Sequence, residues 1–414
     1  MGNPSISMKY YSLLILFVAV LVSHCLSPNI SYARDDESVP DLLRELRERD
    51  VEKWFEDRII RKFLKPYEDA KKWLHDKANL EMAWQQLFIY QSATGGRNPN
   101  DTGISNFTFF GQWHLVDHPS FGKGTLGYFF ERRDNLADAT VTEFTNEVGT
   151  AWDTNDFGIS TRDRTALRQL WWEQRILNEK LVLTIGKLHP ENYYDRNSFA
   201  GSGSTKFVSQ PFAVNPTRLF PSDALGLNVA IYPSNNYYLT FGFNDANGKP
   251  TTSGFNSIDE SEFFKAFLFG LTPVFDGLGQ GNYRFTFWHT DETDDHDDGF
   301  GFLLSCDQEF GKSLGVFLKF GYSEAKLKTI EYLLSGGMVI RNPRGIKGDL
   351  FGMGISWDNP NDTVGEEYSM EIFYRFQLTT HVQLTPNVVF IINPSEKENS
   401  GELAVFGLRF RALF

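Results

Sequence analysis

The chain has 414 residues and a formal net charge of −13 at pH 7, an acidic balance that argues against nucleic acid as a partner. Aromatic residues make up 15% of the sequence and 35 glycines accompany them, yet the mean hydropathy is −0.33. A composition that is rich in aromatic residues and glycine but polar on average favours many strands, each with one apolar face.

The first 33 residues have the pattern of a secretory signal peptide. Lys9 supplies positive charge, residues 13–26 form an apolar core, and the triplet SYA at 31–33 offers small residues to signal peptidase, so we expect cleavage after this triplet. An uncleaved anchor and a lipoprotein attached through Cys25 are the alternatives. Cleavage would leave Cys306 as the only cysteine, which excludes an internal disulfide and a paired-cysteine metal site.

Residues 34–77 are dense in charge and in helix-forming residues, with apolar positions at roughly helical spacing. Ser38 is expected to cap the start of a helix that has Pro40 in its first turn, and Pro66 is expected to break or end it. We predict an amphipathic helical segment that is periplasmic or packs on the body of the protein. A coiled coil is the alternative, although charged residues interrupt its heptad seam.

From residue 79 the hydrophobic pattern has a period of two, which indicates strands. Each predicted strand is long enough, when tilted, to cross a bilayer. The connections are long after odd-numbered strands and mostly short after even-numbered ones, as in outer-membrane barrels. The sixteen predicted strands are 79–91, 104–117, 121–132, 166–177, 179–189, 223–233, 236–244, 260–272, 280–290, 299–310, 313–323, 331–341, 347–358, 366–378, 380–393 and 401–414.

The expected fold class is therefore all-β: a transmembrane antiparallel β-barrel of about 16 strands over 78–414, preceded by a short N-terminal periplasmic α-helical segment. An even number of strands places both termini of the chain that forms the barrel in the periplasm. The segment 281–290 illustrates the faces: Phe285 and Phe287 should meet lipid, while Arg284 and Trp288 point inward. A charge on the lipid side near the midplane would cost about 2–4 kcal/mol.

Several segments, taken in order, resemble the carbohydrate-selective (OprB-type) porins. The sequence LTPNVVFIINPSEKENSGELAVFGLRFRALF at 384–414 resembles the C-terminal end of that family, residues 67–96 its approach to the first strand, and residues 170–208 its central part. The resemblance spans 67–414. The charged helix at 35–65 departs from the short start that the family would have.

This resemblance implies a sixteen-stranded porin that passes sugars, glucose-like monosaccharides in particular, across the outer membrane of a Gram-negative bacterium. It also implies that the last residue, Phe414, belongs to the signal that the barrel-assembly machinery reads. As a strand, the C-terminus should pair with the first strand and close the barrel without a free edge. Phe414 and Ala412 should then face lipid, with Arg409 and Arg411 inward near the periplasmic end.

A selective pore needs a narrowing, and the long connection 190–222 is the candidate for it, because excursions of this length in barrels are usually functional. The connection combines polar groups that bind hydroxyls with aromatic rings, and a sugar needs both. Across the pore, alternation places arginines and a tryptophan inward. The candidate pore and sugar-contact residues are Glu173, Glu191, Asn192, Tyr194, Asp195, Arg196, Asn197, Arg284, Trp288, Lys319, Glu371 and Arg375.

The alternatives to this interpretation are structural or concern the solute. The connection 190–222 could cap the barrel outside or contact a subunit, and luminal arginines could pair with carboxylates such as Glu371 and stiffen the wall. The channel could be general, or serve organic acids or phosphate, or the barrel could anchor the envelope through its N-terminal helix. Homotrimer and monomer both stay open.

Chemistry other than transport finds little support. The motif H-E-x-x-H and a phosphate-binding loop are absent, and the single G-x-S-x-G, at 311–315, lies at a turn between two predicted strands rather than between a strand and a helix. We therefore expect no enzyme, no catalytic residue, no cofactor and no metal ligand. The acidic loop 290–300 lacks the closing glutamate of a calcium loop and is expected to be external. The expected partners are carbohydrate solutes, outer-membrane lipid and lipopolysaccharide, and the barrel-assembly machinery, with no nucleic acid.

Overall fold

The computed structural model describes residues 38–49, 55, 58–94, 100–158, 163–201, 203–255, 257–324, 326–327, 330–361, 365–396 and 401–414. The predicted signal peptide and its cleavage site lie outside these residues. Within them, no helix is both long and apolar enough to span a membrane.

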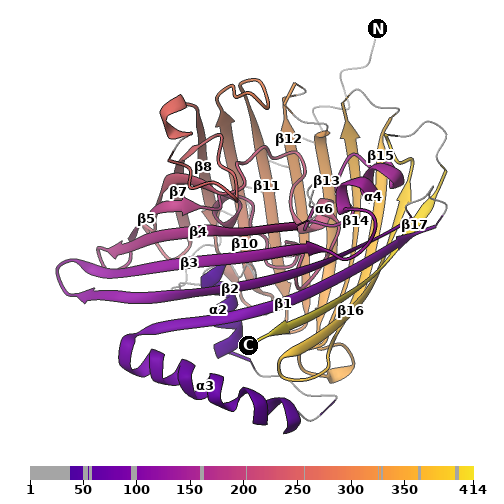
Figure 1. Ribbon diagram of the computed structural model, residues 1–414. Coiled ribbons are helices and arrows are strands. Elements are labelled where there is room, and N and C mark those ends of the chain that lie inside the picture. The colour runs from indigo at the N-terminus through magenta and orange to yellow at the C-terminus, as the bar shows by residue number, and fades with distance from the viewer. Residues whose placement is uncertain are drawn as a thin grey trace.

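The wall of the molecule is a closed antiparallel barrel of sixteen strands (Figure 1), so the predicted fold class is confirmed. Each strand overlaps one of the sixteen predicted segments, because lipid outside and a polar lumen inside impose the period of two. The wall strands are β1 (Leu80–Ala93), β2 (Asp101–His118), β3 (Gly122–Asn135), β4 (Asp163–Ile176), β5 (Leu181–Leu188), β6 (Ala224–Ile231), β7 (Tyr237–Asp245), β8 (Phe263–Leu271), β10 (Gly279–Thr290), β11 (Gly299–Phe310), β12 (Leu314–Ser323), β13 (Ile330–Arg341), β14 (Leu350–Pro360), β15 (Glu367–Gln377), β16 (Val382–Ile392) and β17 (Leu403–Leu413).

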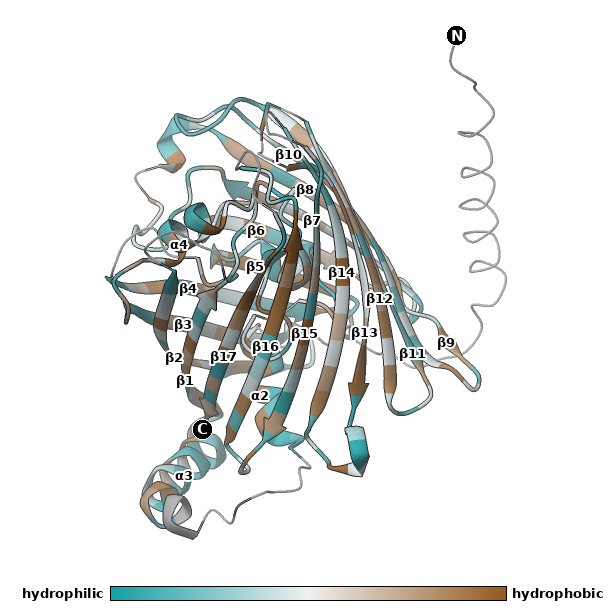
Figure 2. Ribbon diagram, turned by 90° about the vertical axis from the view of Figure 1, so that its right-hand side faces the viewer, coloured by the Kyte–Doolittle hydropathy of each residue, from teal (hydrophilic) through white to brown (hydrophobic). Residues whose placement is uncertain are grey.

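The two faces of the wall differ in the way that alternation predicts. On β10, Phe285 and Phe287 are 41% and 42% exposed on the outer side, while Arg284 and Trp288 are buried inside. Hydropathy alternates along the wall strands in the same way in Figure 2. A two-residue strand, β9 (Val274–Phe275), lies outside this scheme and pairs with the start of β10.

The last strand closes the barrel against the first, as predicted. Residues of β17 pair with β1 in the register Gln85↔Leu413, and Trp84 and Phe414 exchange two backbone hydrogen bonds of 3.0 and 2.9 Å. The expectation that Phe414 and Ala412 face lipid needs correction, because both are buried. The Phe414 ring stacks on Trp84 and His381, with centroid distances of 4.4 and 4.9 Å, so neighbouring side chains cover it.

In its described residues, the predicted N-terminal helical segment contains the helices α2 (Val39–Arg47) and α3 (Arg58–Ala78). Ser38 caps α2 by accepting a hydrogen bond from the Asp41 N–H, as predicted. Pro66 neither breaks nor ends its helix: α3 runs through it to Ala78. Proline removes one intrahelical hydrogen bond, and the turns on both sides of it keep half-buried residues against the barrel, which holds the helix together.

The barrel holds additional elements in its interior. Helix α2 lies within the ring of strands, while α3 lies outside it at the end where the C-terminus is found (Figure 1). The other short helices lie in connections between strands: α4 (Val141–Val148), α5 (Glu191–Tyr194), α6 (Gln210–Ala213), η1 (Ile258–Glu260) and η2 (Pro343–Gly345). The two longest connections, 136–162 and 189–223, carry α4, α5 and α6, and they form the site.

Candidate functional site

The connection between β5 and β6, residues 189–223, lies against the inner face of the wall, and we call it the inner loop. Glu371 on β15 accepts hydrogen bonds from the backbone N–H groups of Val208 and Ser209 at 2.8 and 3.0 Å. Arg409 on β17 donates to the carbonyl oxygen of Lys206 at 2.8 Å. Inward side chains in the middle of two strands therefore hold the loop by its backbone.

An earlier part of the inner loop, at Arg196 and Asn197, is bound to β10 and β11. Arg284 donates from Nη1 to the Arg196 carbonyl at 3.1 Å and to the Asp307 carboxylate at 2.8 Å. Asn197 donates to Ser305 Oγ at 3.0 Å. The inner loop thus reaches from β10 and β11 to β15 and β17, and it occupies lumen that an open barrel would leave to water.

The connection between β3 and β4, residues 136–162, also bonds to inner-face residues, and the sequence reasoning did not anticipate this. Gln91 on β1 donates to the Thr154 carbonyl at 2.9 Å. The two connections bond to each other as well, through Asp156 N–H to the Val208 carbonyl at 2.9 Å and Gln210 N–H to the Asp153 carbonyl at 3.1 Å. Together they make one inner layer.

Helix α2 fills a further part of the lumen. Its buried apolar residues, Val39, Leu42 and Leu43, pack in one cluster with inward side chains of the wall that include Phe129 and Leu413. An ion pair also holds the helix: the Glu45 carboxylate accepts hydrogen bonds from Nη1 and Nη2 of Arg411 at 2.9 and 2.8 Å. The prediction of a helix that is periplasmic or packed on the body did not place it inside the ring.

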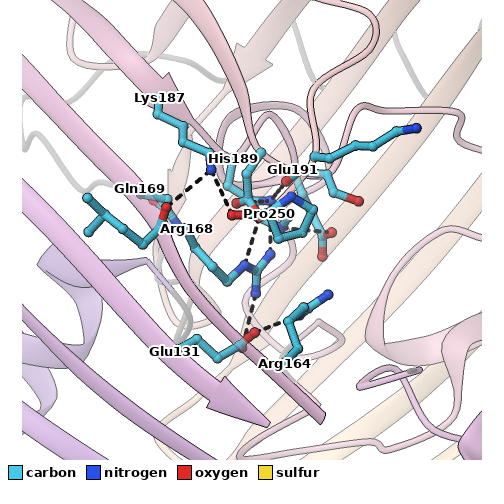
Figure 3. A network of polar contacts seen from close by, with 12 residues as sticks. Glu131, Arg164, Arg168, Gln169, Lys187, His189, Glu191 and Pro250 are labelled. Carbon is cyan, nitrogen blue, oxygen red and sulfur yellow. Dashed lines mark hydrogen bonds and ion pairs between the residues drawn. The ribbon is translucent and has the colours of Figure 1, made fainter. Parts of the chain in front are cut away.

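Charged side chains of β3, β4 and the inner loop form a connected group that we call the charge network (Figure 3). At its centre, the buried Glu131 lies 3.0, 2.6 and 3.3 Å from nitrogens of Arg133, Arg164 and Arg168. Arg168 also contacts Asp223 at 2.8 Å. A buried carboxylate is tolerated only when it is paired and hydrogen-bonded, so each member of the network depends on the others.

His189 extends the charge network along the inner loop. Its Nε2 lies 3.4 Å from Glu191, its Nδ1 lies 3.2 Å from Asp223, and Arg218 contacts Glu191 at 2.6 Å. Burial lowers the pKa of His189, but the carboxylates of Asp223 and Glu191 outweigh it and raise the pKa to about 9. With acceptors at both ring nitrogens, the imidazolium form fits the site at neutral pH.

The charge network lines a cavity of about 310 Å³. Three phenylalanine rings, Phe129, Phe157 and Phe220, line the same cavity. Two more cavities lie around α2: one of about 450 Å³ includes Asp41 and Arg375, and one of about 230 Å³ includes Glu173 and Arg196. Each of the three combines acidic and basic side chains with hydrogen-bonding groups.

The predicted site residues divide into two groups. Five line these cavities: Glu173, Glu191, Asn192, Arg196 and Arg375. The other seven are buried where the inner loop meets the wall: Tyr194, Asp195, Asn197, Arg284, Trp288, Lys319 and Glu371.

Two residues of the buried group illustrate its role. Trp288, expected as a stacking platform for a sugar, is packed against the rings of Phe220 and Phe264, with centroid distances of 6.1 and 6.4 Å. Lys319 places its Nζ 3.6 Å from the Asp195 carboxylate. These side chains contact protein on every side, so they position the inner loop. Arg409 belongs with them, although we expected it near the periplasmic exit.

The sequence prediction placed the site on the long connection after β5, and it therefore did not include the central residues of the charge network: Glu131, Arg133, Arg164 and Arg168. A signal existed, since Glu131 lies near the end of the predicted strand 121–132 and Arg133 directly follows that strand with the same alternation; a charge on that face must point inward. Nothing in the spacing, however, indicated which inward charges the loops would cover.

The model of the carbohydrate-selective porin family, OprB, matches residues 83–414. Porin AaxA of Chlamydia abortus is 23% identical over 319 residues, which cover 72% of this chain and 67% of that protein. Porin AaxA of Chlamydia trachomatis serovar L2 is 22% identical over 308 residues, 70% of this chain and 64% of that protein. The chain thus spans about two thirds of the length of these relatives.

Among solved structures, the high-pH structure of Pseudomonas putida OprB has a TM-score of 0.70 at 15% identity, covering 88% of this chain and 99% of that one. The low-pH structure of the same protein has a TM-score of 0.53 at 16% identity, covering 84% and 96%. At such identities the likeness shows the barrel fold alone.

Proposed function

Because the chain belongs to the OprB family of carbohydrate-selective porins, we propose that it admits carbohydrates, glucose-like monosaccharides in particular, to the periplasm by passive diffusion. The family and the barrel indicate a channel of the outer membrane rather than an enzyme. The observation that carries the sugar proposal is the cavity of about 310 Å³, where the charge network meets three phenylalanine rings.

A sugar offers many hydroxyl groups together with apolar C–H faces. In the cavity, Arg164 and Arg168 present guanidinium donors, Glu131 and Glu191 present acceptors, and Phe129 presents an apolar ring. Ligand pockets range over roughly 300–1,000 Å³, and the small size of this one favours a monosaccharide over a longer chain. The paired charges reduce the net field, which favours an uncharged solute over a strongly charged one.

Liposome swelling with the mature protein tests this proposal. Glucose should enter faster than a disaccharide, an organic acid or phosphate. Equal permeation by all of them would instead indicate a general porin, and faster entry of the anions would indicate that the arginines select for negative charge. No permeation would favour a barrel that anchors the envelope.

A matched pair of variants connects permeation to the cavity. Arg164→Gln removes a lining guanidinium, whereas Arg132→Gln removes an exposed arginine that pairs with Asp134 on the outer side of β3. One hydrogen bond contributes about 0.5–1.5 kcal/mol, so Arg164→Gln should lower the preference for glucose over the disaccharide by up to about tenfold. Arg132→Gln should leave it unchanged. An equal preference for glucose over the disaccharide in the two variants would show that the cavity does not lie on the transport path.

The orientation and assembly of the barrel are part of the same proposal. We place the two chain ends of the barrel, Leu80 and Phe414, and helix α3 on the periplasmic side, with α2 reaching into the lumen from there. We assign Phe414 to recognition by the assembly machinery. Support comes from the start of β1 and the end of β17, which lie at the same rim of the barrel as α3 (Figure 1). An epitope inserted in 291–298 should be reached by antibody on intact cells, while one before α2 should not. The mass of the purified protein in detergent separates monomer from trimer.

A further inference from the structure

Helix α3 occupies a distinctive position outside the barrel wall. The Tyr67 hydroxyl lies 3.5 Å from the Phe414 carbonyl, and the indole of Trp113 on β2 donates to the Ala78 carbonyl at 2.9 Å. The helix lies below the start of β1 (Figure 1), and in Figure 2 it lies beneath the rim of the barrel. It therefore lies outside the wall, at the rim where β1 starts and β17 ends.

One stripe of α3 faces the barrel. Leu64, Tyr67, Lys71 and Leu74 are half-buried, and their spacing of three and four residues places them on one side of the helix. This stripe explains how the helix is attached. It does not account for the other apolar residues, which lie on a neighbouring side.

A second stripe of α3 is apolar and exposed. Phe63 is 80% exposed and Trp73 is 60% exposed, and Ala70, also exposed, lies between them at helical spacing. Exposed aromatic residues in register on one helix need a partner, because isolated apolar residues are ordinary on protein surfaces but aligned ones mark a contact.

The surface beside this stripe identifies the partner. On the adjacent strand and turn, Trp113 is 41% exposed, Leu115 46% and Phe121 68%. In a membrane barrel, such residues at a rim form the aromatic girdle that meets the lipid interface. Trp113 contacts the last residue of α3 directly. The C-terminal end of α3 is thus joined to a surface that already faces lipid.

The charge of α3 points to the same partner. The helix contains seven Lys or Arg and three Asp or Glu, a net charge of +4, whereas the whole chain carries −13. A basic amphipathic helix with Trp and Phe on its apolar side is typical of binding at an anionic membrane interface.

We propose that α3 is an interfacial helix. It lies in the membrane leaflet next to the rim where β1 starts and β17 ends. Phe63, Ala70 and Trp73 enter the boundary between headgroups and acyl chains, and the lysines contact anionic phospholipid headgroups. The helix thereby extends the lipid-facing surface of the barrel beyond its rim and anchors the chain segment that leads into α2.

Nitroxide accessibility in the full mature chain tests the proposal. In a Cys306→Ser background, Ala70→Cys reports the apolar stripe and Asp76→Cys reports another exposed side of α3, each in vesicles of phosphatidylcholine with phosphatidylglycerol. The label at 70 should be several-fold more accessible to oxygen than to a water-soluble nickel chelate, and the label at 76 should show the reverse. Adding Phe63→Asp and Trp73→Asp should make the label at 70 accessible to the chelate.

Further arms separate the outcomes. Phe285→Cys on the outer wall should report lipid in every sample, which shows that the barrel has inserted whether or not sugar permeates. Vesicles of phosphatidylcholine alone should reduce the depth of the label at 70, because the anionic headgroups are missing. Two results would overturn the proposal: equal exposure to water at 70 and 76, or spin–spin broadening at 70 that disappears on dilution with unlabelled protein, since that would place a second copy on the stripe.

Discussion

Two sets of inward charges, both buried by the same barrel, are used in opposite ways. The anchoring set, which comprises Arg284, Lys319, Glu371 and Arg409, contacts the inner loop, and three of its members bond to the loop backbone. In the charge network, charged side chains bond to one another around a cavity. Alternation predicts that both sets point inward; only the path of the loops decides which set meets solute.

The largest effect should come from breaking the anchoring set. Asp307→Ala leaves Arg284 buried without its carboxylate partner and removes an acceptor from Ser198 N–H. Loss of one member of a buried ion pair costs about 3–5 kcal/mol, so the free energy of unfolding in detergent should fall by that amount. Current through single channels should become noisier as the loop detaches. The matched change on the outer side of β3, Asp134→Ala at a half-buried carboxylate, should cost no more than about 1 kcal/mol.

A stability loss for Asp307→Ala as small as that for Asp134→Ala would contradict the division into two sets. It would mean that the inner loop holds its place without the ionic contact at β10 and β11.

The charge network should reveal itself by its pH dependence. The pKa of His189 is raised from its ordinary 6.5 to about 9 by the neighbouring carboxylates, which outweigh burial. A raised pKa stabilises the fold fully below about 6.5, and this contribution is lost as the pH rises through about 9. The loss should reach at most about 3 kcal/mol, measured as the change in unfolding midpoint between pH 6 and pH 10.

The control for this pH effect is His189→Gln, which keeps a hydrogen-bonding side chain but cannot titrate. It should remove the step between pH 6 and pH 10 and lower stability mainly at pH 6. A step of unchanged size in the variant would assign the pH dependence to another group.

The contrast between the anchoring set and the charge network also shows how much of the fold and of the site the sequence can predict. The wall follows from local physics, because each strand residue meets either lipid or lumen; Phe285 and Arg284 could therefore be assigned correctly. The interior depends on tertiary packing. The apolar residues Leu42 and Leu43 predicted that one face of α2 is buried. They did not indicate that this face packs inside the barrel. In the connection 136–162, Thr140 and Glu143 form a capping box at the start of α4. This spacing indicates a helix start in the sequence, but the sequence prediction did not include the helix.

The smallest effect should come from the contact between α2 and the wall. Glu45→Gln removes the carboxylate that pairs with Arg411, but the guanidinium keeps hydrogen bonds to Gln85 at 2.6 Å and to Gln383 at 3.1 Å, and the new amide oxygen can still accept from it. Because Glu45 is partly exposed, the loss of stability should be about 1 kcal/mol or less, and single-channel conductance should rise slightly if α2 narrows the pore. Glu366→Gln, an exposed change on the outer rim, should alter neither. Unchanged conductance on removal of residues 35–49 would show that α2 does not limit the flow of solute, and the narrowing would then lie in the two inner connections alone.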